Sequence, residues 1–252
     1  MSAPPATAPA WSDAGPYDAA LRAGRGPLFL RRPDGRLLPL DVERWCARAD
    51  AVDRDVLDRC EGAVLDVGCG PGRLVAELAA RGRTALGIDV SGAAVEHSVR
   101  LGGRALRRSV FAPLPGAGRW DTVLLMDGNI GIGGDPCALL RRVAELLRPG
   151  GLLIVETAPA DVDERLDVHI TDAHAAYGAP FPWARLGTRA LLRHARDWER
   201  AGQWTAGGRR FAALRSRSSR TTSSSAEPPK RTAVISSQRV RNTSGGRPVA
   251  DR

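Results

Sequence analysis

The residues best suited to chemistry lie in a glycine-rich segment, Val64-Leu65-Asp66-Val67-Gly68-Cys69-Gly70-Pro71-Gly72. An apolar run ends there in three alternating glycines, and a helical pattern follows. Glycines let a ligand approach the backbone closely, and free N–H groups at a helix start bind carboxylates or phosphates. The spacing is G-x-G-x-G, with Arg73 where a dinucleotide fingerprint has its third glycine. The segment therefore predicts a ligand site and argues against NAD or FAD.

A second acidic residue ends the next apolar run, Leu86-Gly87-Ile88-Asp89. At the carboxyl end of a strand, the Asp89 carboxylate can accept two hydrogen bonds from neighbouring hydroxyl groups, a pairing that a single acid makes well. The alternative is that Asp89 belongs to the cap of the following helix, ahead of Ser91. Both interpretations place Asp89 beside the glycine-rich turn.

A third candidate is the loop from Asp127 to Gly134, which has four glycines in eight residues. Asp127 or Asn129 can orient a nucleophile or act as a general base there. The alternative is that the two side chains stabilise the turn through local hydrogen bonds. The loop follows an apolar run, so it is expected at the same edge of the sheet as the glycine-rich turn.

Short apolar runs alternate with amphipathic helices over the middle of the chain. Strands are predicted at residues 63–67, 84–89, 104–110, 121–126 and 152–156, and helices at 72–81, 91–100 and 135–147. Five such strands with intervening segments predict a doubly wound α/β fold, a mostly parallel sheet with helices on both faces. A helix near 187–195 and strands near 196–204 and 209–215 are expected to complete the sheet.

The flanking segments differ from this body in composition. Residues 1–14 are predicted to be a disordered leader, and residues 15–60 an N-terminal helical cap that covers the site, with one helical pattern running on from Asp41. The main domain is placed at residues 61–215. Residues 216–252 contain nine serines and few apolar residues, which predicts a disordered and functionally idle tail.

Charge and cysteine content exclude several classes of protein. The 252-residue chain carries a formal charge of +9, but residues 216–252 account for +6 of it, so a nucleic-acid partner is not expected for the body. The four cysteines form no C-x-x-C pair, which argues against a disulfide scaffold and a metal site. Because there is neither an 18-residue apolar run nor a secretory signal pattern, a cytoplasmic protein without membrane contact is expected.

Four segments together resemble the class I S-adenosylmethionine-dependent methyltransferases. Residues 64–72 are similar to motif I, [DE]-x-G-x-G-x-G, and residues 86–91 to the second-strand motif with its terminal acid. Residues 120–127 and 147–155 resemble the fourth strand and the turn into the fifth. The similarity covers about residues 60–157 and implies a Rossmann-like fold with S-adenosylmethionine as cofactor.

The resemblance also implies roles for single residues. Asp66 would face the cofactor's ammonium group and Asp89 its ribose hydroxyls. Where the family commonly has an acid for the adenine amino group, this chain has Arg108-Ser109-Val110-Phe111, so Ser109 or Val110 would make that contact. The cofactor residues expected are Asp66, Gly68, Cys69, Gly70, Gly72, Asp89, Val90, Ser109, Val110 and Asp127.

The acceptor is predicted to be a small molecule, because the Asn/Asp-Pro-Pro-aromatic signature of amino-methylating DNA enzymes is absent at residues 127–130. Tyr17, residues 39–45 and residues 181–183 are expected to cover the site, and His169 and His174 are candidate acceptor contacts. Methyl transfer needs mainly alignment, since the sulfonium is already activated. The alternatives are a non-catalytic cofactor-binding protein, a nucleic-acid methyltransferase that uses the basic tail, and an NAD-binding oxidoreductase.

Overall fold

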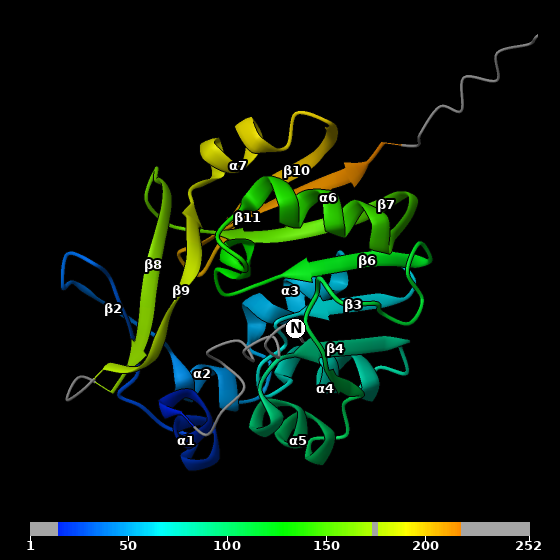
Figure 1. Cartoon of the computed structure of the whole chain (residues 1–252). Coiled ribbons are helices and arrows are strands. Elements are labelled where there is room, and N and C mark those ends of the chain that lie inside the picture. The colour runs from blue at the N-terminus through cyan, green and yellow to red at the C-terminus, as the bar shows by residue number, and fades with distance from the viewer. Residues whose placement is uncertain (1–14, 173–175, 218–252) are drawn as a thin grey trace, which may run out of the picture. The chain divides into compact units, whose positions relative to one another are not determined.

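The computed structural model describes residues 15–172 and 176–217 (Figure 1). Its main sheet has seven strands in the order β10-β11-β7-β6-β3-β4-β5. The strands are β3 (Val64–Val67), β4 (Ala85–Asp89), β5 (Ala105–Arg107), β6 (Trp120–Leu125), β7 (Leu147–Thr157), β10 (Trp198–Ala206) and β11 (Arg209–Ser216). The first five are parallel, while β11 pairs antiparallel with both β7 and β10. The predicted doubly wound α/β fold is confirmed.

Helices cover both faces of this sheet. They are α3 (Ala51–Asp58), α4 (Arg73–Ala80), α5 (Gly92–Arg100), α6 (Pro136–Leu146) and α7 (Thr188–His194). Two local sequence signals set helix starts, as predicted: the hydroxyl of Ser91 accepts from Ala94 N, and the carboxylate of Asp135 accepts from Cys137 N and Ala138 N.

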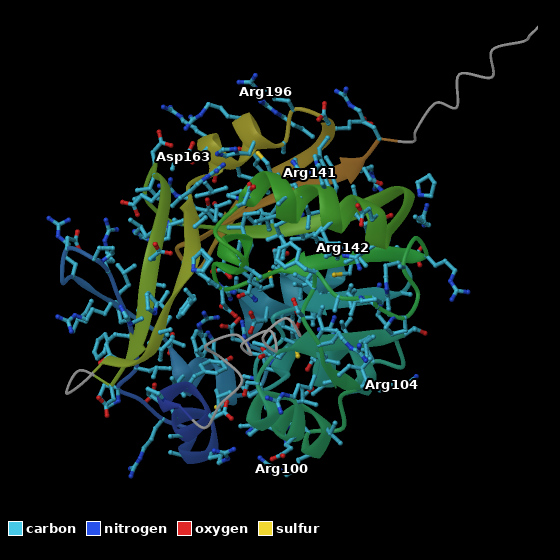
Figure 2. The ribbon with its side chains drawn as sticks, viewed as in Figure 1. Arg100, Arg104, Arg141, Arg142, Asp163 and Arg196 are labelled. Atoms are coloured by element: carbon cyan, nitrogen blue, oxygen red, sulfur yellow. The ribbon has the colours of Figure 1, made fainter. Side chains whose placement is uncertain are left out.

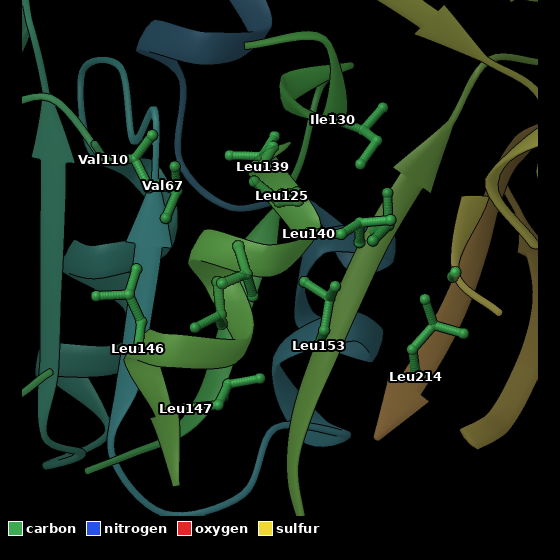
Figure 3. Packing of buried hydrophobic residues seen from close by; sticks show 14 of the residues in the cluster. Val67, Val110, Leu125, Ile130, Leu139, Leu140, Leu146, Leu147, Leu153 and Leu214 are labelled. Atoms are coloured by element: carbon green, nitrogen blue, oxygen red, sulfur yellow. The ribbon is translucent and has the colours of Figure 1, made fainter. Parts of the chain in front are cut away.

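Alternating residues of the central strands pack into different clusters. Leu153 and Val155 of β7 join the cluster that contains α6 and α7, whereas Leu152 and Ile154 join the one that contains α3 and α4. Figure 3 shows the first cluster, with Leu140 of α6 near Leu153 of β7. Because both faces are buried, the strands read as continuous apolar runs.

A second, antiparallel sheet has the order β2-β1-β8-β9. Its strands are β1 (Phe29–Arg31), β2 (Leu37–Pro39), β8 (Asp163–Thr171) and β9 (Ala176–Leu186), and Figure 1 shows β8 and β9 side by side, away from the main sheet. The helices α1 (Pro16–Ala23) and α2 (Val42–Cys46) lie beside it, with apolar side chains of α1, β1 and β8 in one cluster. We call the second sheet together with α1 and α2 the cap.

The cap departs from the helical cap predicted for residues 15–60. Half of its sheet comes from β8 and β9, more than 100 residues later in the chain, and β1 pairs with β8 through Leu30 and Ile170. The single helix expected from Asp41 is two helices, because the chain is non-helical at residues 47–50 and Asp50 forms a new capping box with Asp53. Among the described residues, no helix is long and apolar enough to cross a membrane.

Candidate functional site

A cavity of about 1250 Å³ lies between the cap and the carboxyl ends of β3, β4, β6 and β7. This edge is where open parallel sheets bind ligands. The main sheet contributes the turns after its strands, including Gly68 to Pro71, Asp89, Val90 and Asp127 to Ile130. The cap contributes mainly apolar and aromatic side chains, namely Tyr17, Leu30, Leu38, Trp45, Ile170, Phe181 and Trp183.

The glycine-rich turn has positive φ at its three glycines: 70° at Gly68, 54° at Gly70 and 89° at Gly72. A Cβ on Gly70 would meet only the Tyr17 hydroxyl, at 3.7 Å, so the backbone there is open to a ligand. A Cβ on Gly72 would lie 2.1 Å from Ser98 Oγ of α5, and Gly72 does not line the cavity. The missing side chain of Gly72 allows α4 to start against α5, and contact of Gly72 with the cofactor stays a prediction.

Asp89 lies at the cavity with both carboxylate oxygens oriented. Oδ2 accepts from Gly70 N and Oδ1 from Ser91 N, each at 2.9 Å. Burial raises the pKa of Asp89 to about 6, opposed by these backbone hydrogen bonds. Each oxygen keeps lone-pair capacity for one more donor, as a pair of ribose hydroxyls requires. The hydrogen bond from Ser91 N agrees with the helix-cap interpretation of Asp89, and binding of ribose hydroxyls stays a prediction.

Asp66 lies beneath the turn, 2% exposed and not among the cavity-lining residues. Its Oδ2 has no hydrogen-bond partner, and burial raises its pKa to about 7 although Arg73 acts in the opposite direction. Neither Asp66 nor Asp89 forms an ion pair within the described part of the chain, and we call them the uncompensated acids.

Other predicted cofactor residues are found at the cavity wall. Val90, Ser109 and Val110 line it beside Asp89, and the Ser109 hydroxyl accepts from Phe111 N at 3.2 Å. Cys69 also lines the cavity, but a Cβ on Gly87 of β4 would lie 2.6 Å from its Sγ, which places the thiol against that strand.

Sequence analysis did not identify a set of arginines around Asp127. Arg73 donates to both Asp53 carboxylate oxygens, at 2.8 and 3.2 Å, and its Nη2 lies 2.8 Å from Asp127 Oδ2. Arg44 of the cap donates to the other Asp127 oxygen. Arg73 is only 4% exposed. The residue that stands where a dinucleotide fingerprint has its third glycine is therefore a buried structural cation.

The same cluster continues onto the last strand. Arg209 of β11 donates to Asp53 at 2.8 Å and to both Glu156 oxygens, at 2.8 and 2.7 Å. Glu156 in turn accepts from Asp127 N at 2.9 Å. We call the six residues Arg44, Asp53, Arg73, Asp127, Glu156 and Arg209 the arginine network. Its three cations and three anions join α2, α3, α4, β7 and β11 to the loop after β6.

The network changes the interpretation of Asp127 and Asn129. Three guanidinium groups hold the pKa of Asp127 below its usual range despite its burial, which makes it a weak base. Asp127 is the non-glycine residue with positive φ, 55°, in the described part of the chain. The amide of Asn129 donates to the carbonyls of Val67 and Gly68, at 2.9 and 2.8 Å. Both side chains hold the cavity edge in place through contacts with distant parts of the chain, rather than through the local hydrogen bonds of the structural alternative named above.

The predicted acceptor contacts are divided. Tyr17 lines the cavity, as do Pro39 to Asp41 and Phe181 to Trp183. His169 does not line the cavity. Its neighbours on β8, Val168 and Ile170, both pack into the apolar cluster of the cap, and successive side chains of a strand point to opposite faces, so His169 points to the other face. Contact of His169 with the acceptor stays a prediction, and His174 lies outside the described residues. The glycines after Asp127 also have another purpose, since a Cβ on Gly131 would lie 2.2 Å from the Ala184 carbonyl of β9.

These features fit S-adenosylmethionine. The open backbone at Gly70, the two remaining lone pairs of Asp89 and the unpaired Asp66 oxygen match a ligand with vicinal hydroxyls and positive charge. Together with the parallel sheet, they define the class I S-adenosylmethionine-dependent methyltransferases.

Comparison with known proteins gives the family. The sequence model of the family described as "Methyltransferase domain" matches residues 41–211. A ubiquinone biosynthesis O-methyltransferase of Caulobacter sp. (strain K31) is 33% identical over 177 residues, which are 62% of this chain and 68% of the relative. The protein of the same description from Caulobacter vibrioides is 35% identical over 144 residues, 50% of this chain and 56% of the relative.

Solved structures show the same fold. A S-adenosylmethionine-dependent methyltransferase of Bacteroides fragilis, in complex with S-adenosylhomocysteine, has a TM-score of 0.69 at 22% identity, covering 83% of this chain and 97% of that one. The 1,6-didemethyltoxoflavin-N1-methyltransferase of Burkholderia thailandensis has a TM-score of 0.51 at 21% identity, with 69% and 79% covered. The chain belongs to the methyltransferase domain family, and the predicted class and enzyme activity are confirmed.

Proposed function

We propose that this methyltransferase transfers a methyl group to a hydroxyl of a small, apolar, ring-bearing molecule held under the cap. The cap wall of the cavity supports the proposal, because Trp45, Ile170, Phe181 and Trp183 face the turns of the main sheet. Aromatic side chains bind flat apolar rings by stacking and by edge contacts. The description of the two Caulobacter relatives as O-methyltransferases favours oxygen as the accepting atom.

The cofactor half of the cavity is assigned to the main sheet. Gly68 and Gly70 admit the methionyl part, Asp89 accepts the ribose hydroxyls, and Val90, Ser109 and Val110 surround the adenine. When bound, S-adenosylmethionine supplies a methyl group already activated on a sulfonium. The chain's own residues then have to bind, align and exclude water, because alignment provides most of the rate.

Arg44 completes the cofactor half from the cap. Its Nη1 is buried without a hydrogen-bond partner among the described residues, while its other nitrogens bind Asp41 and Asp127. A guanidinium with a free N–H matches a carboxylate. We assign it to the cofactor's carboxylate, and the unpaired Oδ2 of Asp66 to the charge of the ammonium group, acting from beneath the turn.

Trp45 supplies the contact to the acceptor. Its Nε1 is buried and unpaired within the described part of the chain, and the ring packs edge-on against Tyr17 with centroids 6.3 Å apart. An indole N–H is a neutral donor suited to a phenolic or carbonyl oxygen. The acceptor is thus oriented by one hydrogen bond and by the ring faces of the cap.

The test is transfer from S-adenosylmethionine to a panel of acceptors, with turnover read as S-adenosylhomocysteine formed. Catechols with and without alkyl chains represent the proposed class, and glycerol and amino acids represent polar acceptors. Trp45→Phe should raise KM for the preferred catechol about 2- to 10-fold, the value of one neutral hydrogen bond, and leave cofactor affinity unchanged.

Trp204→Phe is the matched control. Trp204 Nε1 is also buried and unpaired among the described residues, but neither Trp204 nor Phe211, on which its ring stacks, lines the cavity. Its substitution should leave KM unchanged. A preference for polar acceptors, or equal effects of the two tryptophan substitutions, would contradict the proposed acceptor class. The expectations of a cytoplasmic location and of no nucleic-acid partner stay predictions.

A further inference from the structure

A cysteine, a histidine and an aspartate meet outside the cavity. Cys137 Sγ of α6 lies 3.3 Å from His194 Nδ1 at the end of α7. The other ring nitrogen, His194 Nε2, lies 3.0 and 3.2 Å from the two carboxylate oxygens of Asp163. Asp163 is the first residue of β8, and Figure 2 shows it at the end of that strand nearest α7. None of the three residues lines the cavity.

The order of contacts is that of an activated nucleophile. A carboxylate at Nε2 holds the ring proton on that nitrogen, which leaves the Nδ1 lone pair directed at the thiol. The hydrogen bond from His194 keeps the pKa of Asp163 below its usual range, and Arg193, which donates to Asp163 at 3.2 Å, acts in the same direction. Asp163 is therefore ionised near neutral pH. A nucleophile, a base and a group that orients the base are thus in sequence.

The backbone adds to this arrangement. Cys137 is the second residue of the 11-residue helix α6, at the end where the helix dipole is positive. Asp135 caps the same helix and opposes that effect, while Arg165 Nη2 lies 3.8 Å from its carboxylate. Cys137 is a partly exposed residue, as a site for a diffusing reagent must be.

The other three cysteines lack these features. Burial raises the pKa of Cys60 to about 12 and that of Cys69 well above its usual value, and their thiols contact backbone carbonyls. Cys46 is partly exposed like Cys137, but burial and the neighbouring Glu43 raise its pKa. The four thiols therefore offer an internal comparison within one folded chain.

We propose that Cys137 is a nucleophilic thiol, activated by His194 and Asp163, that a hydroperoxide oxidises to a sulfenic acid. His194 Nδ1 takes the thiol proton, and the sulfur attacks the terminal oxygen of the hydroperoxide. The S–O bond forms as the O–O bond breaks. Sulfur loses two electrons, and the hydroperoxide is reduced to an alcohol, or to water from hydrogen peroxide, which leaves with the proton from His194.

Two probes test the thiol in the folded, full-length protein at neutral pH. Iodoacetamide alkylation, followed by peptide mass spectrometry, gives the rate at each cysteine, and hydrogen peroxide with dimedone traps the sulfenic acid. Cys137 is expected to react about tenfold or more faster than Cys46 with both reagents. Cys137→Ser removes the fast label and leaves methyl transfer unchanged, because the thiol lies outside the cavity.

Two variants separate activation from structure. His194→Gln retains a polar side chain without the base, and should slow Cys137 alkylation about tenfold or more while the rate at Cys46 stays constant. Asp163→Asn should slow it less, since the base remains. A merely structural contact would lower Tm in these variants and leave the alkylation rate equal or higher through greater exposure. Equal rates at Cys137 and Cys46 in the wild-type protein would overturn the proposal without any variant.

Discussion

The uncompensated acids and the arginine network lie on neighbouring parts of the same sheet edge, yet their electrostatics are opposite. Asp66 and Asp89 are buried without an ion pair among the described residues, and burial raises their pKa values to about 7 and about 6. Asp53 is fully buried as well, but Arg73 and Arg209 lower its pKa to about 2. Burial alone therefore does not set the ionisation of an acid here: the distribution of arginines does.

The difference separates binding from scaffold. An acid that remains unpaired in the protein retains capacity for a ligand's hydroxyls or positive charge, at a cost in stability. An acid matched by guanidinium groups has no such capacity, and its removal leaves a buried cation alone. Asp127 lines the cavity, but its carboxylate is paired with arginines of the network, which lower its pKa. Its position at the cavity therefore does not by itself support a role as a general base.

The largest expected effect comes from breaking the network at Arg73. Arg73→Met removes one of the two cations that Asp53 and Asp127 share, the other being Arg209, and should reduce the free energy of unfolding by about 3–5 kcal/mol. Thermal unfolding should show a Tm lower by on the order of 10 °C. Arg81→Met is the control, because Arg81, the residue that follows α4, forms partly exposed ion pairs with Glu77 of α4 and Asp58 of α3. Its removal should cost less than about 1 kcal/mol. Equal losses of unfolding free energy in the two variants would mean that the buried network stabilises the protein no more than surface ion pairs do.

A slightly smaller effect is expected at the glycine-rich turn. Gly70→Val should weaken S-adenosylmethionine binding at least about 100-fold, because a branched side chain fills the open space and resists the positive φ. Gly82→Val is matched for backbone strain, with φ 68° and nothing within 4 Å of a Cβ, but lies away from the cavity. Calorimetry should find its cofactor affinity unchanged. Normal binding by Gly70→Val would mean that the cofactor lies elsewhere.

Asp89→Ala should weaken cofactor binding by about 1.5–3 kcal/mol, the range for hydrogen bonds to a charged group. Its backbone contacts at Gly70 and Ser91 make a general loosening of the turn the competing explanation. Comparing S-adenosylhomocysteine with its 2′,3′-dideoxy analogue resolves this, since the dideoxy compound should lose little further affinity in the variant. An equal loss for both ligands would assign Asp89 a structural role alone.

Asp66→Asn should stabilise the protein and weaken cofactor binding together. Because the folded pKa of Asp66 is about 7 against a reference of 3.8, the folded state binds more protons between these values and loses stability as pH rises through that window. The variant should therefore unfold at a higher temperature than the wild type at pH 8, by a few degrees, with the difference shrinking toward pH 5. A difference independent of pH would contradict an uncompensated charge.

The smallest effect is expected from removing residues 218–252. The last described strand, β11, ends at Ser216, and Arg215 donates to both carboxylate oxygens of Glu61, so the sheet and its final ion pair are retained. Truncation after Arg217 should leave Tm and cofactor affinity unchanged. A fall in either would mean that the basic tail contributes to the folded enzyme.

Most of the main sheet and the position of its ligand site could be predicted, because they depend on local patterns. The apolar runs, the caps at Ser91 and Asp135 and the positive-φ glycines act within a few residues of themselves. Gly72 and His169 are not among the cavity-lining residues, and the reason lies outside their local sequence. The first contacts α5 and the second lies on a strand whose pairing with β1 spans more than 100 residues, and neither neighbour is visible in the local sequence.

The sequence by itself determined the parallel α/β sheet, the glycine-rich turn and the acid after β4, since backbone conformation and strand burial are encoded by neighbouring residues. Only the tertiary structure decided which charges are paired. Arg44, Arg73 and Arg209 are three of 36 arginines, and the first and last are more than 160 positions apart. Nothing near them in the chain distinguishes them from surface residues. Coulomb energies and desolvation depend on distance and burial in space, so the ionisation of the site is set only when α2, α4 and β11 come together.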